Sequence, residues 1–145
     1  METSVIPKRG MAPIALVLLL AGCGGDGANR GSVSGKVTLN GAALESGSIS
    51  FVPIEGTQSP SSGATIANGS YEIPRDKGPM VGKYQVVITS SRKTGKKIAA
   101  GSPAPAGTMI EEVVEAVPAI YNVKSTLRGE VKPGSNTFDY ELKAP

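Results

Sequence analysis

Beyond residue 31, glycine, proline and asparagine divide the sequence into short apolar segments, and this division limits the folds open to the chain. In the first segment Val37 and Leu39 lie on one side of an extended chain, whereas Lys36 lies on the other. A period of two is typical of a strand buried on one face. Asn40-Gly41 follows directly, and this pair tolerates the positive φ angles of a tight hairpin turn. The pattern therefore predicts short strands joined by tight turns.

The same pattern gives strand-like segments along most of the chain, at 32–39, 47–53, 64–66, 71–73, 82–89, 127–131 and 136–142. The segment 82–89 holds a nearly continuous apolar run, which predicts a strand at the middle of the sheet or one buried on both faces. Gly, Ser, Thr and Val are plentiful, a balance that favours strands and turns. We expect an all-β fold, an antiparallel β-sandwich of about seven strands.

Two stretches depart from this pattern. Residues 90–107 begin with a polar, basic run and continue with proline, alanine and glycine, which predicts a long exposed loop. Residues 109–117 carry apolar side chains at helical spacing, and a proline follows directly, as is typical of a short helix. The same residues are rich in valine, which favours strands. A short helix and a strand both remain open for 109–117.

The N-terminal residues have the layout of a secretory signal peptide. Lys8 and Arg9 precede an apolar run from Met11 to Ala21 that is too short to span a bilayer. The single cysteine of the chain follows, and Leu20-Ala21-Gly22-Cys23 resembles the lipobox of bacterial lipoproteins. In that family the signal is cut before the cysteine, whose thiol carries a diacylglycerol. The resemblance implies that Cys23 is the lipidation site and the mature N-terminus.

We expect three parts in the chain: a lipoprotein signal peptide at 1–22, a lipidated cysteine with a flexible glycine-rich tether at 23–31, and one β-sandwich domain at 32–145. Gly24 stands where some bacterial lipoproteins carry the aspartate that retains them at the inner membrane. By that comparison the expected location is the cell envelope, lipid-anchored, at the outer membrane rather than the inner one.

Several passages carry a second resemblance: Val33–Gly41, Gly47–Pro53, Asn68–Tyr71 and Gly82–Ile88. They are similar to the carboxypeptidase regulatory-like domain, which has a transthyretin-like sandwich. The tail from Pro118 to Leu142 resembles the ending of many small bacterial lipoproteins that carry this domain. The resemblance implies a compact, non-catalytic module of surface proteins with no shared ligand, so it assigns no functional residue.

The chain contains no histidine. Ser-His-Asp and Cys-His catalysis and histidine metal sites therefore have no candidates, and acylation would occupy the single thiol. Hydroxyisourate hydrolases resemble transthyretin but use histidines. Glu111, Glu112 and Glu115 could offer oxygens to a divalent ion, but they lack the alternating Asp/Asn loop of calcium sites, and exposed charges explain them better. We expect no enzyme, cofactor or metal.

Arg92, Lys93, Lys96 and Lys97 form a basic cluster and are the candidate ligand-binding residues. They could attract acidic glycan or phosphate-bearing headgroups, although a solvated loop explains them better. The net charge of +3 gives no support to nucleic-acid binding. The expected function is a membrane-anchored structural or interaction module with envelope proteins or glycans as partners. The alternative is a binding protein for acidic glycan or phosphate through residues 92–97.

Overall fold

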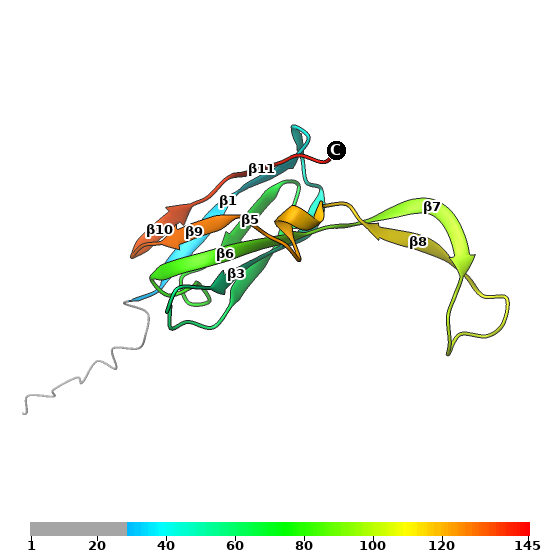
Figure 1. The fold of residues 1–145 in the computed structure, drawn as a ribbon, viewed down its shortest axis with the longest axis horizontal. Helices are drawn as coiled ribbons and strands as arrows, with labels where there is room; N and C mark the ends of the chain where they lie inside the picture. The colour runs from blue at the N-terminus through cyan, green and yellow to red at the C-terminus, as the bar shows by residue number, and fades with distance from the viewer. Residues whose placement is uncertain (1–28) are drawn as a thin grey trace, which may run out of the picture.

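The computed structural model describes residues 29–145 and consists of a β-sandwich body from which one long hairpin projects (Figure 1). The strands are β1 (Gly31–Leu39), β2 (Ala42–Ala43), β3 (Ser46–Pro53), β4 (Ser62–Ala67), β5 (Ser70–Ile73), β6 (Gly82–Thr89), β7 (Ser91–Ala99), β8 (Met109–Glu115), β9 (Arg128–Val131), β10 (Gly134–Thr137) and β11 (Tyr140–Leu142). The prediction of an all-β, sandwich-like fold is confirmed. One 3-10 turn, η2 (Ala119–Tyr121), interrupts the strands. The predicted signal peptide at 1–22 and Cys23 lie outside the described residues.

Seven strands form one hydrogen-bonded path in the order β10-β1-β5-β4-β3-β6-β9. Strands β4 and β5 share a single residue pair, Ala67 with Ser70, whereas β3 and β4 pair along six residues. The path folds over at the β4–β5 turn. As a result, β1, β5 and β11 lie opposite β3 and β6. The described chain has eleven strands instead of the predicted seven or so, and β1 pairs in parallel with β10 and β11, so the sheet is not purely antiparallel.

Two tight turns lie where the sequence predicts them. Asn40 and Gly41 have φ angles of 53° and 82°, and Asn68 and Gly69 have φ angles of 51° and 74°. Positive φ at both central positions matches the right-handed twist of the flanking strands, which explains the Asn-Gly pairs. Strand β3 ends at Pro53, also as predicted.

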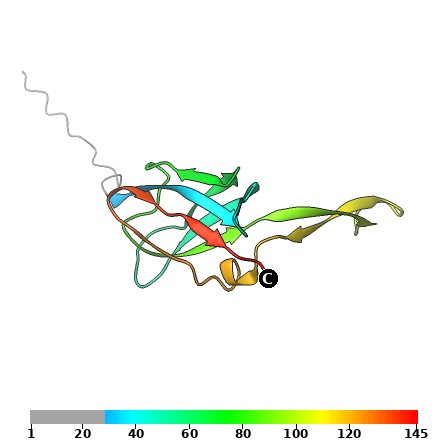
Figure 2. The same cartoon turned by 90° about the horizontal axis from the view of Figure 1, so that it is seen from above.

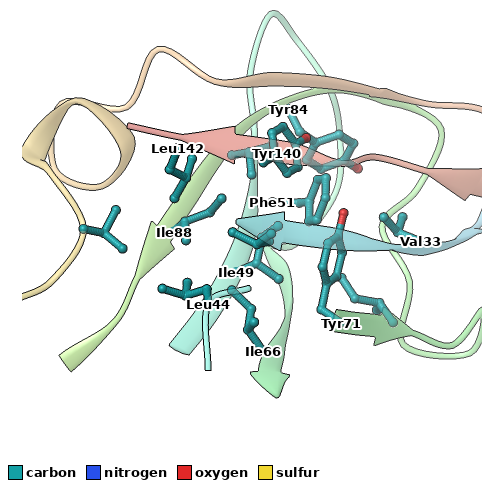
Figure 3. Close-up of a cluster of buried hydrophobic side chains, with 14 of the residues drawn as sticks. Val33, Leu44, Ile49, Phe51, Ile66, Tyr71, Tyr84, Ile88, Tyr140 and Leu142 are labelled. Atoms are coloured by element: carbon teal, nitrogen blue, oxygen red, sulfur yellow. The ribbon is translucent and has the colours of Figure 1, made fainter. Parts of the chain in front are cut away.

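The core lies between the two layers and is filled by alternate residues of the strands (Figure 3). Strand β6 buries Tyr84, Val86 and Ile88 while the residues between them are half-buried. It pairs with β3 on one side and β9 on the other, which confirms its predicted place in the middle of the sheet. The alternative of burial on both faces is wrong, because only one side of β6 faces the opposite layer.

Phe51 of β3 is at the centre of an aromatic cluster that joins the two layers (Figure 3). Its ring centroid lies 6.4 Å from that of Tyr71, 6.2 Å from that of Tyr84 and 6.0 Å from that of Phe138. These separations suit tilted and edge-to-face ring contacts. The Phe51 side chain thus links four parts of the sandwich: β3, β5, β6 and the connection between β10 and β11.

The predicted final strand at 136–142 is divided in two, because the chain is displaced at Phe138 and Asp139. The Phe138 N–H donates to the Ser34 carbonyl, and the Lys36 N–H donates to the Asp139 carboxylate at 2.7 Å, so a side chain replaces a backbone acceptor there. A Cβ atom at Gly35 would lie 1.9 Å from the Phe138 oxygen. Only glycine allows so close an approach of the two backbones.

Two buried tyrosines provide a matched test of this core. The Tyr71 hydroxyl donates to the Phe138 carbonyl at 2.8 Å, whereas the buried Tyr140 hydroxyl has no hydrogen-bond partner among the described residues. Burial raises the pKa of both hydroxyl groups. We predict that Tyr71→Phe lowers the free energy of unfolding by about 1 kcal/mol, because it leaves a carbonyl unpaired. Tyr140→Phe should cost nothing or stabilise, because it removes an unpaired polar group.

Urea denaturation of the two variants and the parent chain measures the difference. Equal losses in both variants would contradict the assigned hydrogen bonding.

Candidate functional site

The most distinctive feature of the molecule is the hairpin formed by β7 and β8, which extends away from the body in both views (Figures 1 and 2). Within the described residues these strands pair only with each other. The predicted long loop at 90–107 is largely exposed, as expected, but the conformation predicted for 92–97 is wrong, because this stretch belongs to β7. The structure also decides the open choice at 109–117: Met109–Glu115 is a strand and not a helix.

The β7–β8 pairing explains both outcomes. A helix at 109–117 would need a buried surface for its apolar face, and β8 instead finds a partner strand whose residues pair with its own. Its isoleucine and valines are β-branched and suit an extended chain. The register shifts between Lys93 and Lys97, where Gly95 adopts a φ of 80°. Glycine in this left-handed conformation is typical of a bulge, so the polar run continues as a strand instead of breaking it.

All four residues of the predicted basic cluster lie on exposed positions of β7, and two of them have acidic partners on β8. Lys93 lies 3.1 Å from Glu111, and Lys96 lies 3.9 Å from Glu112. Arg92 and Lys97 have no ion-pair partner within residues 29–145. Both lysine side chains are about 70% exposed, so each ion pair contributes little to stability. The pairs do, however, reduce the positive field expected of this cluster.

Sequence reasoning missed the apolar side chains that the hairpin exposes. Met109, Ile110 and Val113 have exposed fractions of 53%, 48% and 54%. Their helical spacing suggested a buried helix face, whereas on β8 they alternate between two faces that no described element covers. The sequence signal for this exposed strand was the run of β-branched residues next to glutamates.

The hairpin is firmly attached at its base. One carboxylate oxygen of Glu115 accepts the backbone N–H of Ser90 at 2.8 Å and that of Val117 at 3.0 Å. The Ser90 hydroxyl donates to the Ser46 carbonyl, and the Asn122 amide donates to the Val117 carbonyl at 3.0 Å. Ser90, Val117 and Asn122 are buried. These bonds tie the start of β7 and the end of β8 to the body, so the hairpin has a defined direction.

A groove of about 690 Å³ lies beside this base, where the hairpin meets the loop before β3. Its lining includes Leu44, Glu45, Ser90, Arg92 and Lys93.

A second charged feature lies away from the hairpin. It is the ion pair of Lys83 and Glu55, whose side chains are 2.6 Å apart. The hydrogen bond and charge of Lys83 lower the pKa of Glu55, and Glu55 raises the pKa of Lys83. Both side chains are more than half exposed, so this is a surface ion pair.

Residues 29–145 contain no group of three or more histidine, cysteine, aspartate or glutamate side chains placed to hold a metal ion. Glu111, Glu112 and Glu115 instead contact Lys93, Lys96 and the hairpin base. Within the same residues, no helix has the length and apolar character needed to cross a membrane.

Comparison of the chain with protein-family models, with curated proteins and with solved structures gave no significant match.

The role of Glu115 can be tested by substitution. We predict that Glu115→Ala loosens the hairpin by about 1 to 2 kcal/mol, because two backbone N–H groups lose a charged acceptor. Trypsin should then cleave after Lys93 and Lys97 several-fold faster than in the parent chain. Glu115→Gln retains a side-chain oxygen and serves as the matched control with a smaller effect. Identical cleavage rates for all three chains would show that Glu115 does not hold the base.

Proposed function

We propose that this protein is a lipid-anchored, non-enzymatic lipoprotein of the bacterial cell envelope, in which a carboxypeptidase regulatory-like sandwich carries the β7–β8 hairpin as an interaction module. The lipobox-like sequence at Leu20–Cys23 supports the anchor. The absence of histidine from the sequence supports a role without catalysis. The strand and turn sequences resemble those of the carboxypeptidase regulatory-like domain, and this resemblance supports the proposed family of the sandwich.

The single observation that carries the interaction role is the exposed hairpin. A two-stranded hairpin alone in water is marginally stable, and three or more strands or a packed face are normally needed. Here both faces of β7–β8 are uncovered in the described chain, and three large apolar side chains, those of Met109, Ile110 and Val113, are about half exposed. Exposed apolar groups on a firmly based arm are suited to contact another molecule.

The position of the hairpin agrees with an N-terminal anchor. The described chain begins at the end of the body opposite the hairpin, as both views show (Figures 1 and 2). A flexible tether that leaves the body at this end does not fix the orientation of the domain, but it leaves the hairpin at the end of the body farthest from the point of attachment. The hairpin would then meet partners in the space beyond the membrane surface.

The alternative role, capture of acidic glycan or phosphate through Arg92, Lys93, Lys96 and Lys97, has less support. Three glutamates lie on β8 beside these cations, and two of them lie within ion-pair distance of lysines. An acidic polymer would have to compete with those contacts and overcome the repulsion of the carboxylates. The apolar side chains of β8 also have no part in this alternative.

Lipid attachment is tested by metabolic labelling. In a bacterial host supplied with labelled palmitate, the full-length chain should incorporate label, and Cys23→Ser should incorporate none because the thiol is removed. Globomycin blocks the lipoprotein signal peptidase. In its presence the parent chain should therefore keep its signal peptide and be larger than in untreated cells. Unchanged size together with equal labelling of the two chains would refute the lipoprotein assignment.

The interaction role is tested by photo-crosslinking in the same cells. We expect a photoreactive amino acid at Ile110 on the hairpin to capture a protein reproducibly. The same group at Val81, which is 41% exposed near the opposite end of the body, is the matched control and should capture nothing specific. Equal capture at both positions, or none at Ile110, would contradict the proposed role of the hairpin.

A further inference from the structure

Within residues 29–145 no strand pairs with the outer edge of β8, which leaves a row of backbone hydrogen-bonding groups along it. The Ala116 N–H donates to the Ser90 carbonyl at 2.7 Å, and the Ala100 N–H donates to the Thr108 carbonyl at 2.8 Å. In an antiparallel pair, residues alternate between those bonded to the partner strand and those whose backbone groups point the other way. The outer edge of β8 therefore carries the backbone groups of every second residue, without a break: Met109, Glu111, Val113 and Glu115.

The outer edge of β7 differs. Its register is broken between Lys93 and Lys97, where Gly95 has a positive φ, and four basic side chains lie along it. Bulges and lysines are the devices by which proteins prevent unwanted strand pairing. Strand β8 carries neither, so the hairpin has one protected edge and one open edge.

The side chains of β8 define what could lie along the open edge. Residues 109–114 read Met-Ile-Glu-Glu-Val-Val, with two acidic residues between two apolar pairs, and no basic residue occurs from 98 to 123. Because neighbours alternate in direction, each face of β8 presents a glutamate between two apolar side chains. In the pairing with β7, Lys97 lies opposite Glu111 and Ile98 lies opposite Ile110, whereas Arg92 and Lys93 lie opposite Val114 and Val113.

We propose that the open edge of β8 is a strand-addition site for an extended polypeptide segment of a partner protein, in which two consecutive basic residues lie between pairs of apolar residues. This proposal rests on the proposed interaction function and specifies its partner. The added strand would place its cations beside Glu111 and Glu112 and its apolar side chains beside those of β8, as cross-strand pairs require. It would also turn the two-stranded hairpin into a three-stranded sheet, the smallest with independent stability.

The probe is a fluorescent, end-blocked peptide, Val-Val-Lys-Lys-Val-Val, titrated against the full-length protein in detergent micelles and followed by fluorescence anisotropy. Two control peptides isolate pattern and charge: Val-Lys-Val-Val-Lys-Val has the same composition in another order, and Val-Val-Glu-Glu-Val-Val reverses the charge. We expect both controls to bind at least tenfold more weakly. Equal binding of the reordered peptide would overturn strand addition in favour of general charge attraction, and absence of binding would overturn the site.

Proline substitutions locate the edge. Val113→Pro removes an N–H from the outer edge of β8 and leaves the ladder with β7 intact, so peptide binding should be lost. Ala99→Pro makes the same change on the outer edge of β7, and binding should persist. Equal effects of the two variants would overturn the assignment to β8. Because the peptide comparison uses the unmodified protein, it decides the question even if a proline variant fails to fold.

Two further outcomes separate this inference from the function on which it rests. If Ile110 captures a protein in cells but the lysine peptide does not bind, the interaction role stands and strand addition fails. If light scattering shows that the protein forms dimers which Val113→Pro disrupts, and the peptide does not compete, a second copy occupies the edge and the proposed partner is wrong.

Discussion

The packing of Phe51 is the interaction on which the rest of the structure depends. The sandwich has no disulfide within the described residues, so its two layers are held by packing, and the Phe51 ring contacts aromatic rings from both layers. Loss of a fully buried aromatic ring typically costs about 3 to 5 kcal/mol. That is a large share of the stability of a single small domain. The tight Asn-Gly turns and the close approach at Gly35 bring the strands into the positions that this cluster requires.

The hairpin lies outside the reach of that core, and this separation is the physical basis of the proposed function. The core side chain of β6 nearest to the hairpin is Ile88, and only Ile98 of β7 is even half-buried. The hairpin is therefore held at its base by Glu115, Ser90 and Val117 and along its length by a single ladder and surface ion pairs. The body is therefore well packed, whereas the hairpin is only weakly stabilised. Segments that bind a partner are commonly among the less stable parts of a protein.

Much of the body could be predicted from local sequence signals, since strand alternation and Asn-Gly turns act over a few residues. The division of the last strand could not, because it depends on Asp139 accepting the N–H of Lys36, which is more than a hundred positions away in the chain. The β7 strand was predicted as a loop because its side chains are polar on both faces, and a strand that buries nothing has no alternation. The spacing in β8 fitted a helix equally well, and only the pairing with β7 decides between the two.

Native-state hydrogen exchange of the full-length protein tests whether the body is stable by itself while the hairpin is only weakly stable without a partner. Amides of β3 and β6 should exchange through global unfolding, whereas those of β7 and β8 should exchange at least a hundredfold faster through local opening. The Ser90 and Val117 amides, which donate to Glu115, should be protected more than those along the hairpin. If the β8 amides were as well protected as those of β6, the hairpin would be stable without a partner, which would contradict the proposed role of the hairpin.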